Sequence, residues 1–304
     1  MKITNRHELP ESYWRANAEQ RPFTPGRISV TELLTPPQMR SLRIQFDHEL
    51  EEDCADRIDA FFGTAVHAYL ERYADSRSEA EKTIEWTEPE SGWTVHGTPD
   101  LHGDGTLIDW KTTRVRALQY DRQEWQDQVN LYAHLLRLNG KRVSEIVVWA
   151  FCKDYDPQKR WEDGYPTSAV VKIPMPLWDA DRAHEFLLRR LRLHQAAERG
   201  IYGPCTPEER WQRDTWAVYP LGKIAARAKA VFAEEAQALD YAVVAAPKPR
   251  DWQNWFEIVK REGEPVRCMN WCVVREKCQQ WQAERPDTLT EELEASVIRL
   301  EARA

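Results

Sequence analysis

A β-hairpin encoded in residues 97–111 constrains the fold most strongly. Turn-forming residues centred on Gly103-Asp104 separate two short apolar runs, so we expect two antiparallel strands. Asp100 precedes the turn on the first strand, and Asp109 and Lys111 lie two residues apart on the second. Because side chains alternate between the two faces of a strand, this register predicts that all three charged groups share one face.

Two carboxylates and an ammonium group on one face suit metal-assisted chemistry. The predicted turn sets Asp100 opposite Leu107, with its backbone about 7–8 Å from that of Asp109 on the diagonal. Carboxylates that converge over such a span can hold Mg²⁺, which would polarise a phosphate and activate a water. Lys111 could then stabilise the developing negative charge. An ordinary surface ion pair is the simpler interpretation, but the apolar neighbours of Asp109 make an unliganded carboxylate costly there.

Composition and charge narrow the class of protein. The chain of 304 residues is 42% hydrophobic and 30% charged, as is usual for a globular protein. It has no apolar run of about 18 residues and no signal-peptide pattern at its start, so we expect a cytoplasmic protein with no membrane partner. The net charge of −8 excludes a broadly basic surface that coats duplex DNA. A nucleic-acid enzyme with its cations gathered in one groove is still compatible.

The order of predicted elements indicates an α/β fold, with a central mixed sheet flanked by helices. A capping box at Ser29 and Glu32 opens a helix that Pro36-Pro37 ends. Further helices are expected over residues 38–74, 117–139 and 178–199, and strands over 84–86, 93–95, 107–110, 145–153 and 170–173. We expect an N-terminal arm (1–27), a core domain (28–199), a loop-rich cysteine region (200–283) and a C-terminal helix (284–304).

Two helical patterns flank the hairpin. His67 would share a helical face with Gly63 and Glu71. Alone, such a histidine is best interpreted as a core residue, but with two aspartates nearby it becomes a candidate third metal ligand. Gln128 and Tyr132, four residues apart after the hairpin, could orient a water or a phosphate together. Routine amphipathic packing is the alternative for that pair.

Taken together, these motifs resemble the RecB-type nucleases of the PD-(D/E)XK superfamily, which includes CRISPR-adaptation nucleases and many phage exonucleases. The resemblance covers residues 29–175. It rests on Gly63-x-x-x-His67, Pro99-Asp100, Asp109-x-Lys111 and Gln128-x-x-x-Tyr132.

That resemblance implies a restriction-endonuclease-like core and a role for each matched residue. Mg²⁺ or Mn²⁺ would be bound by His67, Asp100, Asp109 and the carbonyl of Trp110. Lys111 would be catalytic, and Gln128 and Tyr132 would contact DNA near the scissile phosphate.

The expected activity is metal-dependent hydrolysis of DNA, by an exonuclease of phage or bacterial DNA recombination or processing. DNA, single-stranded or at duplex ends, would be the main partner, with a recombination protein or a second copy as further candidates. The alternatives are a catalytically silent nuclease fold that binds DNA or protein, and a cysteine-metal redox protein. Phosphate contacts could come from the arginines at 114, 116, 189, 190 and 192, although solvated surface is the simpler interpretation of the last three.

The cysteines predict a second metal centre. Cys268, Cys272 and Cys278 crowd a short polar segment, one ligand short of a four-thiolate site. Cys205, in a proline-flanked loop, is favoured as the fourth, and Cys54 is the competitor, because in the related nucleases the distant cysteine usually precedes the nuclease motifs. The resemblance implies a [4Fe–4S] cluster, although the x3/x5 spacing departs from the common x2/x5. Structural Zn²⁺ and unligated buried thiols are the alternatives.

Overall fold

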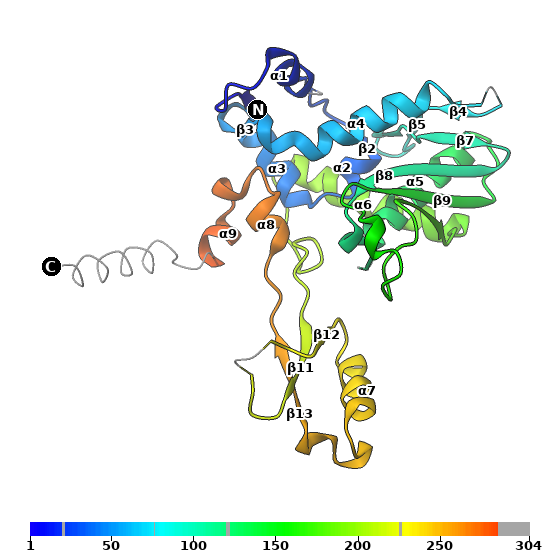
Figure 1. The fold of residues 1–304 in the computed structure, drawn as a ribbon. Coiled ribbons are helices and arrows are strands. Elements are labelled where there is room, and N and C mark those ends of the chain that lie inside the picture. The colour runs from blue at the N-terminus through cyan, green and yellow to red at the C-terminus, as the bar shows by residue number, and fades with distance from the viewer. Residues whose placement is uncertain (20–21, 76, 120–121, 225–226, 285–304) are drawn as a thin grey trace. The chain divides into compact units, whose positions relative to one another are not determined.

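The computed structural model describes residues 1–19, 22–75, 77–119, 122–224 and 227–284. The chain folds as a mixed α/β protein that divides into two compact units, Met1–Gly203 and Pro204–Ala304 (Figure 1). The division falls within a few residues of the boundary expected at 199–200. The helix expected over 284–304 lies outside the described residues except for Glu284. No helix among the described residues is long and apolar enough to span a lipid bilayer.

Unit 1 is built around a five-stranded mixed sheet of order β10-β9-β8-β7-β4, in which the β8–β9 pairing is parallel and the others are antiparallel. A second sheet has the order β2-β6-β5, and β1 pairs with β3 in parallel. The elements are β1 (Lys2–Thr4), α1 (Glu11–Ala18), β2 (Arg27–Ser29), α2 (Val30–Leu33), α3 (Pro37–Phe46), η1 (Asp47–Glu49), β3 (Glu51–Asp53), η2 (Cys54–Arg57), α4 (Ile58–Glu71), β4 (Glu79–Ala80), β5 (Ile84–Thr87), β6 (Thr94–Gly97), β7 (Leu101–Gly103), β8 (Thr106–Thr113), η3 (Val115–Gln119), α5 (Gln123–Leu138), β9 (Glu145–Cys152), η4 (Pro157–Lys159), β10 (Val170–Met175) and α6 (Ala180–Glu198).

Helices α4 and α5 cover opposite faces of the large sheet. Lys111 on β8 contacts Gln128 of α5, whereas the next side chain, Thr112, lies under Gly63 of α4. Successive side chains of a strand point to opposite faces, so the two helices must lie on different sides. The core between the sheets and α5 and α6 is aliphatic and includes Leu107, Leu131, Ile146 and Leu187, each at most 1% exposed.

The hairpin has a different register from the one predicted. Its turn is centred on Asp104-Gly105, where φ is +50° and +80°, and Leu101 pairs with Ile108. A tight two-residue turn requires positive φ at both central residues, which an Asp-Gly pair adopts more easily than Gly-Asp with a bulky second residue. The predicted placement on Gly103-Asp104 was therefore wrong by one residue. Continued by one step, the observed pairing sets Asp100 level with Asp109 rather than with Leu107.

The expected N-terminal arm is part of the folded unit. Strand β1 pairs with β3, and the Asp53 carboxylate accepts hydrogen bonds from the backbone N–H of Arg6 (2.7 Å) and Ala55 (3.0 Å). This pairing also interrupts the single helix predicted over residues 38–74, which the structure divides into α3, η1, β3, η2 and α4. That prediction was wrong because a strand partner far away in the sequence outweighs the local helical pattern.

Unit 2 contains a small antiparallel sheet of order β12-β11-β13 with one helix packed on it. Its elements are β11 (Thr215–Pro220), β12 (Ala230–Phe232), α7 (Glu235–Ala245), η5 (Pro249–Asn254), β13 (Phe256–Arg261), α8 (Val266–Asn270), η6 (Arg275–Lys277) and α9 (Gln279–Glu284). We expected a loop-rich region here, and the sheet was missed. Its fully buried core is small, formed by Val218, Ala238 and Ala242.

A buried histidine makes unit 1 sensitive to acid. His194 is fully buried on α6, and its Nε2 lies 3.0 Å from the carbonyl oxygen of Leu33, to which it donates as the neutral imidazole. Burial, followed by the charge of Arg190, lowers the pKa of His194 from 6.5 to about 3. Between pH 6.5 and about 3, His194 is therefore protonated in the unfolded chain but neutral in the folded chain.

The contribution of neutral His194 to the free energy of unfolding is fully present above about pH 6.5. It is lost as the pH falls toward 3, by up to about 1.4 kcal/mol per pH unit. We expect His194→Gln to flatten the dependence of the unfolding free energy on pH between 6.5 and 4. Urea titrations at several pH values measure this slope. A variant whose slope equals that of the wild type would contradict the assignment.

Candidate active site

The centre of the site is a buried ion pair on β8. The Nζ of Lys111 lies 2.8 Å from Oδ2 of Asp109, whose side chain is 2% exposed. Burial raises the pKa of the Asp109 carboxyl, against the opposing effect of Lys111. Burial lowers the pKa of Lys111, but the charge and hydrogen bond of Asp109 together with the charge of Asp100 outweigh it, so the pKa of Lys111 is raised and the ammonium form is favoured. An ion pair this deep has a high desolvation cost, which is unusual without a function.

A chain of hydrogen bonds holds Lys111 in place. Its Nζ donates to Oε1 of Gln128 at 2.8 Å, and Nε2 of Gln128 is 3.1 Å from the Tyr132 hydroxyl, to which it donates. Gln128 and Tyr132 are four residues apart on α5, so they lie on one face of that helix. Burial raises the pKa of Tyr132 and keeps its hydroxyl protonated. The two helical residues therefore orient the lysine from the face of the sheet that α5 covers.

Gly97 lets strand β6 pass close to this helix. A Cβ built at Gly97 would lie 2.6 Å from Cε1 of Tyr132 and 3.1 Å from a methyl carbon of Val30. Any side chain would push the Tyr132 ring away from Gln128. The glycine is thus required by close packing beside the site.

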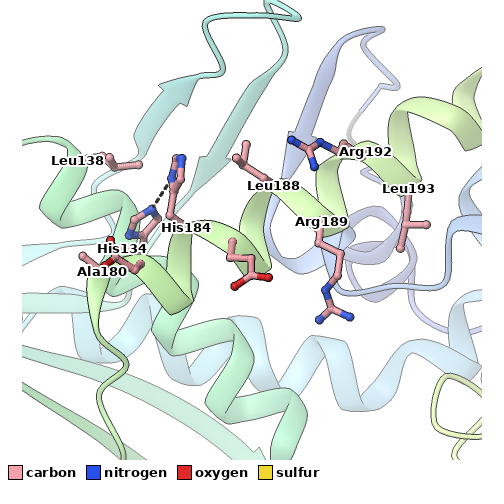
Figure 2. A pocket seen from close by; sticks show the side chains of 10 residues that line it. His134, Leu138, Ala180, His184, Leu188, Arg189, Arg192 and Leu193 are labelled. Atoms are coloured by element: carbon pink, nitrogen blue, oxygen red, sulfur yellow. Dashed lines mark hydrogen bonds between the residues drawn. The ribbon is translucent and has the colours of Figure 1, made fainter.

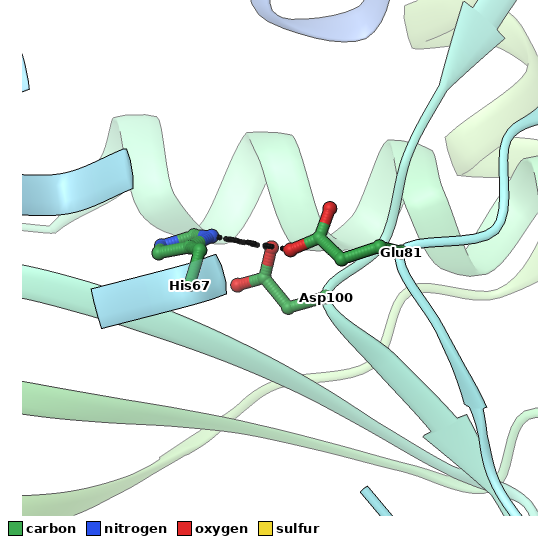
Figure 3. Close-up of side chains that lie close together, drawn as sticks. All are labelled: His67, Glu81 and Asp100. Atoms are coloured by element: carbon green, nitrogen blue, oxygen red, sulfur yellow. Dashed lines mark ion pairs between the residues drawn. The ribbon is translucent and has the colours of Figure 1, made fainter. Parts of the chain in front are cut away.

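A second group of side chains, drawn in Figure 3, consists of His67, Glu81 and Asp100. Nδ1 of His67, on α4, is 3.1 Å from Oδ1 of Asp100 and 3.4 Å from Oε1 of Glu81. The other oxygen of Asp100, Oδ2, accepts the backbone N–H of Trp110 at 2.6 Å, which ties it to β8. Asp100 also raises the pKa of the Asp109 carboxyl, so the two groups share one electrostatic neighbourhood.

This second group has the chemistry of a divalent-metal site. One ligand atom from each of His67, Glu81 and Asp100 lies within 4.8 Å of the others. The Asp100 carboxylate and burial dominate the shifts here: hydrogen bonding to Asp100 raises the pKa of His67, and burial followed by Asp100 raises the pKa of Glu81. Anionic oxygens that raise each other's proton affinity are stabilised by a cation placed between them.

Nε2 of His67 lies 3.0 Å from the carbonyl oxygen of Trp110. With the proton on Nε2, that nitrogen donates to the carbonyl and leaves the Nδ1 lone pair facing the two carboxylates. Metal-binding histidines in proteins are commonly oriented by such a bond to a backbone carbonyl. Trp110, predicted as a metal ligand through its carbonyl, therefore supports the His67 ring with one lone pair of that oxygen.

No family model and no curated protein matches this chain. Among solved structures, a protein titled "Crystal structure of SSO0001" is similar at 14% sequence identity and a TM-score of 0.41, over 58% of this chain and 80% of that one. A likeness of this strength carries no argument about activity.

The predicted site residues fall into two adjoining sets. Asp109, Lys111, Gln128 and Tyr132 form one hydrogen-bonded and ion-paired set, and His67 and Asp100 belong to the other. Arg190, a candidate phosphate contact for which solvated surface was the simpler interpretation, donates to the carbonyl oxygens of Leu33 and Thr35.

Glu81 was missed at the sequence level. It follows β4, in a backbone conformation with φ of +47°, and its N–H donates to the carbonyl of Asp100 at 3.1 Å. Neither its neighbours nor its spacing distinguishes it from the other acidic residues of the segment 79–90. Only the pairing of β4 with β7 brings it to His67.

The cysteines of unit 2 also lie near one another. Burial, then the charges of Glu209 and the three other cysteines, raises the pKa of Cys205 to about 12. Gln280 holds the Cys205 backbone, accepting from its N–H at 2.8 Å and donating to its carbonyl at 3.1 Å. Cys54 belongs to unit 1, where it is fully buried and its Sγ donates to Oδ1 of Asn5 at 3.6 Å. Cys152 is buried at the end of β9.

Proposed function

We propose that unit 1 is a Mg²⁺- or Mn²⁺-dependent deoxyribonuclease with a restriction-endonuclease-like core, and that it acts as an exonuclease. The observation that carries this proposal is the buried Asp109–Lys111 pair directly beside the His67, Glu81 and Asp100 group. A divalent ion near a fixed ammonium group is the combination that phosphodiester hydrolysis requires. The comparisons neither support nor oppose this activity.

His67, Glu81 and Asp100 would hold the ion, with the carboxylate of Asp109 on β8 in their electrostatic neighbourhood. The bound ion would polarise the phosphate and lower the pKa of a water. Lys111, kept protonated by Asp109, places a positive charge where the scissile phosphate gains negative charge. Gln128 and Tyr132 hold the ammonium group of Lys111 in one position. Gln128 binds the lysine, Tyr132 binds Gln128, and both residues belong to α5. Every DNA sequence has the same phosphate backbone, so this site could cleave DNA without contacting the bases.

We further propose that Cys205, Cys268, Cys272 and Cys278 hold a [4Fe–4S] cluster, with Zn²⁺ as the alternative. Four thiols gathered in a unit with a small apolar core form a suitable donor set for either group. The cluster would act as a cross-link between the segment at Cys205 and the one at 268–278. Catalysis would not pass through it.

Cleavage of end-labelled single- and double-stranded DNA tests the nuclease proposal. We expect degradation with Mn²⁺ or Mg²⁺, none with EDTA, and a loss of activity of at least about 100-fold in Asp109→Asn. Shortening from a labelled end, with a covalently closed circle left intact, would establish an exonuclease. If wild type and Asp109→Asn retain the same residual cleavage, the proposal fails. DNA binding without cleavage by the wild type would instead favour a binding module.

A further inference from the structure

Buried nitrogens without a hydrogen-bond partner are rare in folded proteins, so those outside the active site can mark a ligand. One is Nδ1 of His134, at the cavity of about 940 Å³ between α5 and α6 (Figure 2). Its Nε2 is 3.1 Å from Nδ1 of His184, and burial lowers the pKa of His134 to about 4, so the ring is neutral. A missing partner costs less for a neutral ring than for a charged group. The stronger signal therefore lies in unit 2, where the unpartnered nitrogen belongs to a guanidinium.

That guanidinium is the side chain of Arg210. Arg210 is 7% exposed, and its Nε is buried without a hydrogen-bond partner. Its Nη2 pairs with the carboxylate of Glu284, and the guanidinium also forms a hydrogen bond with the side chain of Cys268. Burial lowers the pKa of Arg210, but these two contacts outweigh burial, so the group keeps its charge. A buried charged donor of this kind needs anionic acceptors around it.

The backbone holds Arg210 against the cysteine segment. The carbonyl oxygen of Arg210 accepts the N–H of Arg267 at 3.0 Å, and Cys268 is the next residue along the chain. Cys205 is also close to the three C-terminal cysteines, since their charges act on its thiol. The guanidinium is therefore fixed beside the cysteines that we propose as metal ligands.

Backbone N–H groups also donate to these sulfurs. The N–H of Trp281 donates to Sγ of Cys278 at 3.5 Å, and the backbone of Val274 forms a hydrogen bond with the side chain of Cys272. Hydrogen bonds to the sulfurs are one of the means by which a protein sets the reduction potential of an iron–sulfur cluster. With the contact from Arg210 to Cys268, each of the three C-terminal cysteines has a donor in place.

The unpartnered Nε of Arg210 favours a cluster over a single ion. A zinc ion held by four thiolates brings no acceptor besides those thiolates, whereas a [4Fe–4S] cluster also brings inorganic sulfides, which accept hydrogen bonds. Four thiolates give such a cluster a net negative charge. A fixed positive charge beside it stabilises the reduced form more than the oxidised form, because the reduced form is more negative.

Building on the cluster proposed above, we propose that Arg210 is a positioning residue of the [4Fe–4S] group and raises its reduction potential. The guanidinium would donate to the thiolate of Cys268 and to the sulfides of the cluster, and Glu284 would hold it in that orientation. This role concerns electron affinity and retention of the cluster in unit 2, and it involves no residue of the catalytic site in unit 1.

Redox titration of the anaerobically purified full-length protein, followed by visible absorption, tests this inference. We expect Arg210→Gln to lower the ratio of reduced to oxidised cluster at a fixed potential at least tenfold, which is about 59 mV for a one-electron couple. Arg210→Lys keeps the charge but not the planar set of donors, so its shift should be smaller. Arg261→Gln is the control, since Arg261 binds the hydroxyl of Tyr219 in the sheet of unit 2, and it should leave the potential unchanged.

The iron content of the variants covers the case in which Arg210→Gln does not keep its cluster. Glu284→Gln breaks the ion pair but leaves the guanidinium beside Cys268. Retention of iron in Glu284→Gln with loss in Arg210→Gln would support the role of the arginine. Equal loss in both variants, or an unchanged potential in iron-loaded Arg210→Gln, would overturn it and leave the cluster in place. Zinc without iron in the wild type would overturn the cluster and this inference together.

Discussion

Replacing Lys111 with methionine should reduce metal-dependent DNA cleavage by about 10²–10³-fold, the usual effect of removing one preorganised charge from a transition state. Methionine keeps much of the apolar length of the side chain but removes the charge beside Asp109. The His67, Glu81 and Asp100 group is intact in this variant, so Mn²⁺ binding measured by calorimetry should persist. Single-turnover cleavage with saturating Mn²⁺ separates the two effects.

The same change should also destabilise the protein, because it leaves Asp109 buried without its counter-charge. Removing one partner of a buried ion pair typically costs about 3–5 kcal/mol. The double variant Lys111→Met with Asp109→Asn carries no unpaired charge and should recover much of that stability while staying inactive. Lys153→Met is a matched control, since that lysine pairs with Asp59 outside the site. A folded Lys111→Met protein that cleaves DNA like the wild type would refute the role of the lysine.

Local sequence signals were sufficient to predict secondary structure where a residue's neighbours along the chain determine its conformation. The serine half of the predicted capping box is confirmed, since Ser29 Oγ accepts the N–H of Glu32 at 3.1 Å at the start of α2, whereas the Glu32 carboxylate pairs with Arg40. The helix predicted over 117–139 matches α5 in type and C-terminal end, but α5 begins only at Gln123, and the strand predicted over 145–153 corresponds to β9. Both segments have strong periodicity.

Contacts between distant segments account for what was missed. Strand β3 forms only because β1 pairs with it, and Glu81 joins the site only because β4 pairs with β7. Asp109 and Lys111 share a face as predicted, because they are two residues apart on β8, but the register of the hairpin was predicted wrongly. The turn geometry at Asp104-Gly105 decided that point. One sequence by itself provides no covariation from which such pairings could be read.

Replacing Cys205 or Cys272 with serine should remove the metal that we propose for unit 2 and loosen that unit. Burial, together with the charges of Cys268 and Cys278, raises the pKa of Cys272 to about 11, so its thiolate form needs a cation beside it. The apolar core of the unit is too small to replace the lost cross-link. Losing a structural metal should therefore cost several kcal/mol, and we expect the melting temperature of unit 2 to fall by about 10 °C or more.

Iron and zinc analysis with the visible absorption spectrum identifies the metal, and limited proteolysis reports on unit 2. Cys54→Ser is the control, because Cys54 is a buried thiol that is bonded to Asn5 in unit 1. We expect it to keep a full complement of metal. Loss of metal in Cys54→Ser with retention in Cys205→Ser would make Cys54 the fourth ligand. Full metal content in both Cys205→Ser and Cys272→Ser would rule out a cysteine-bound metal, since neither thiolate could then be a ligand.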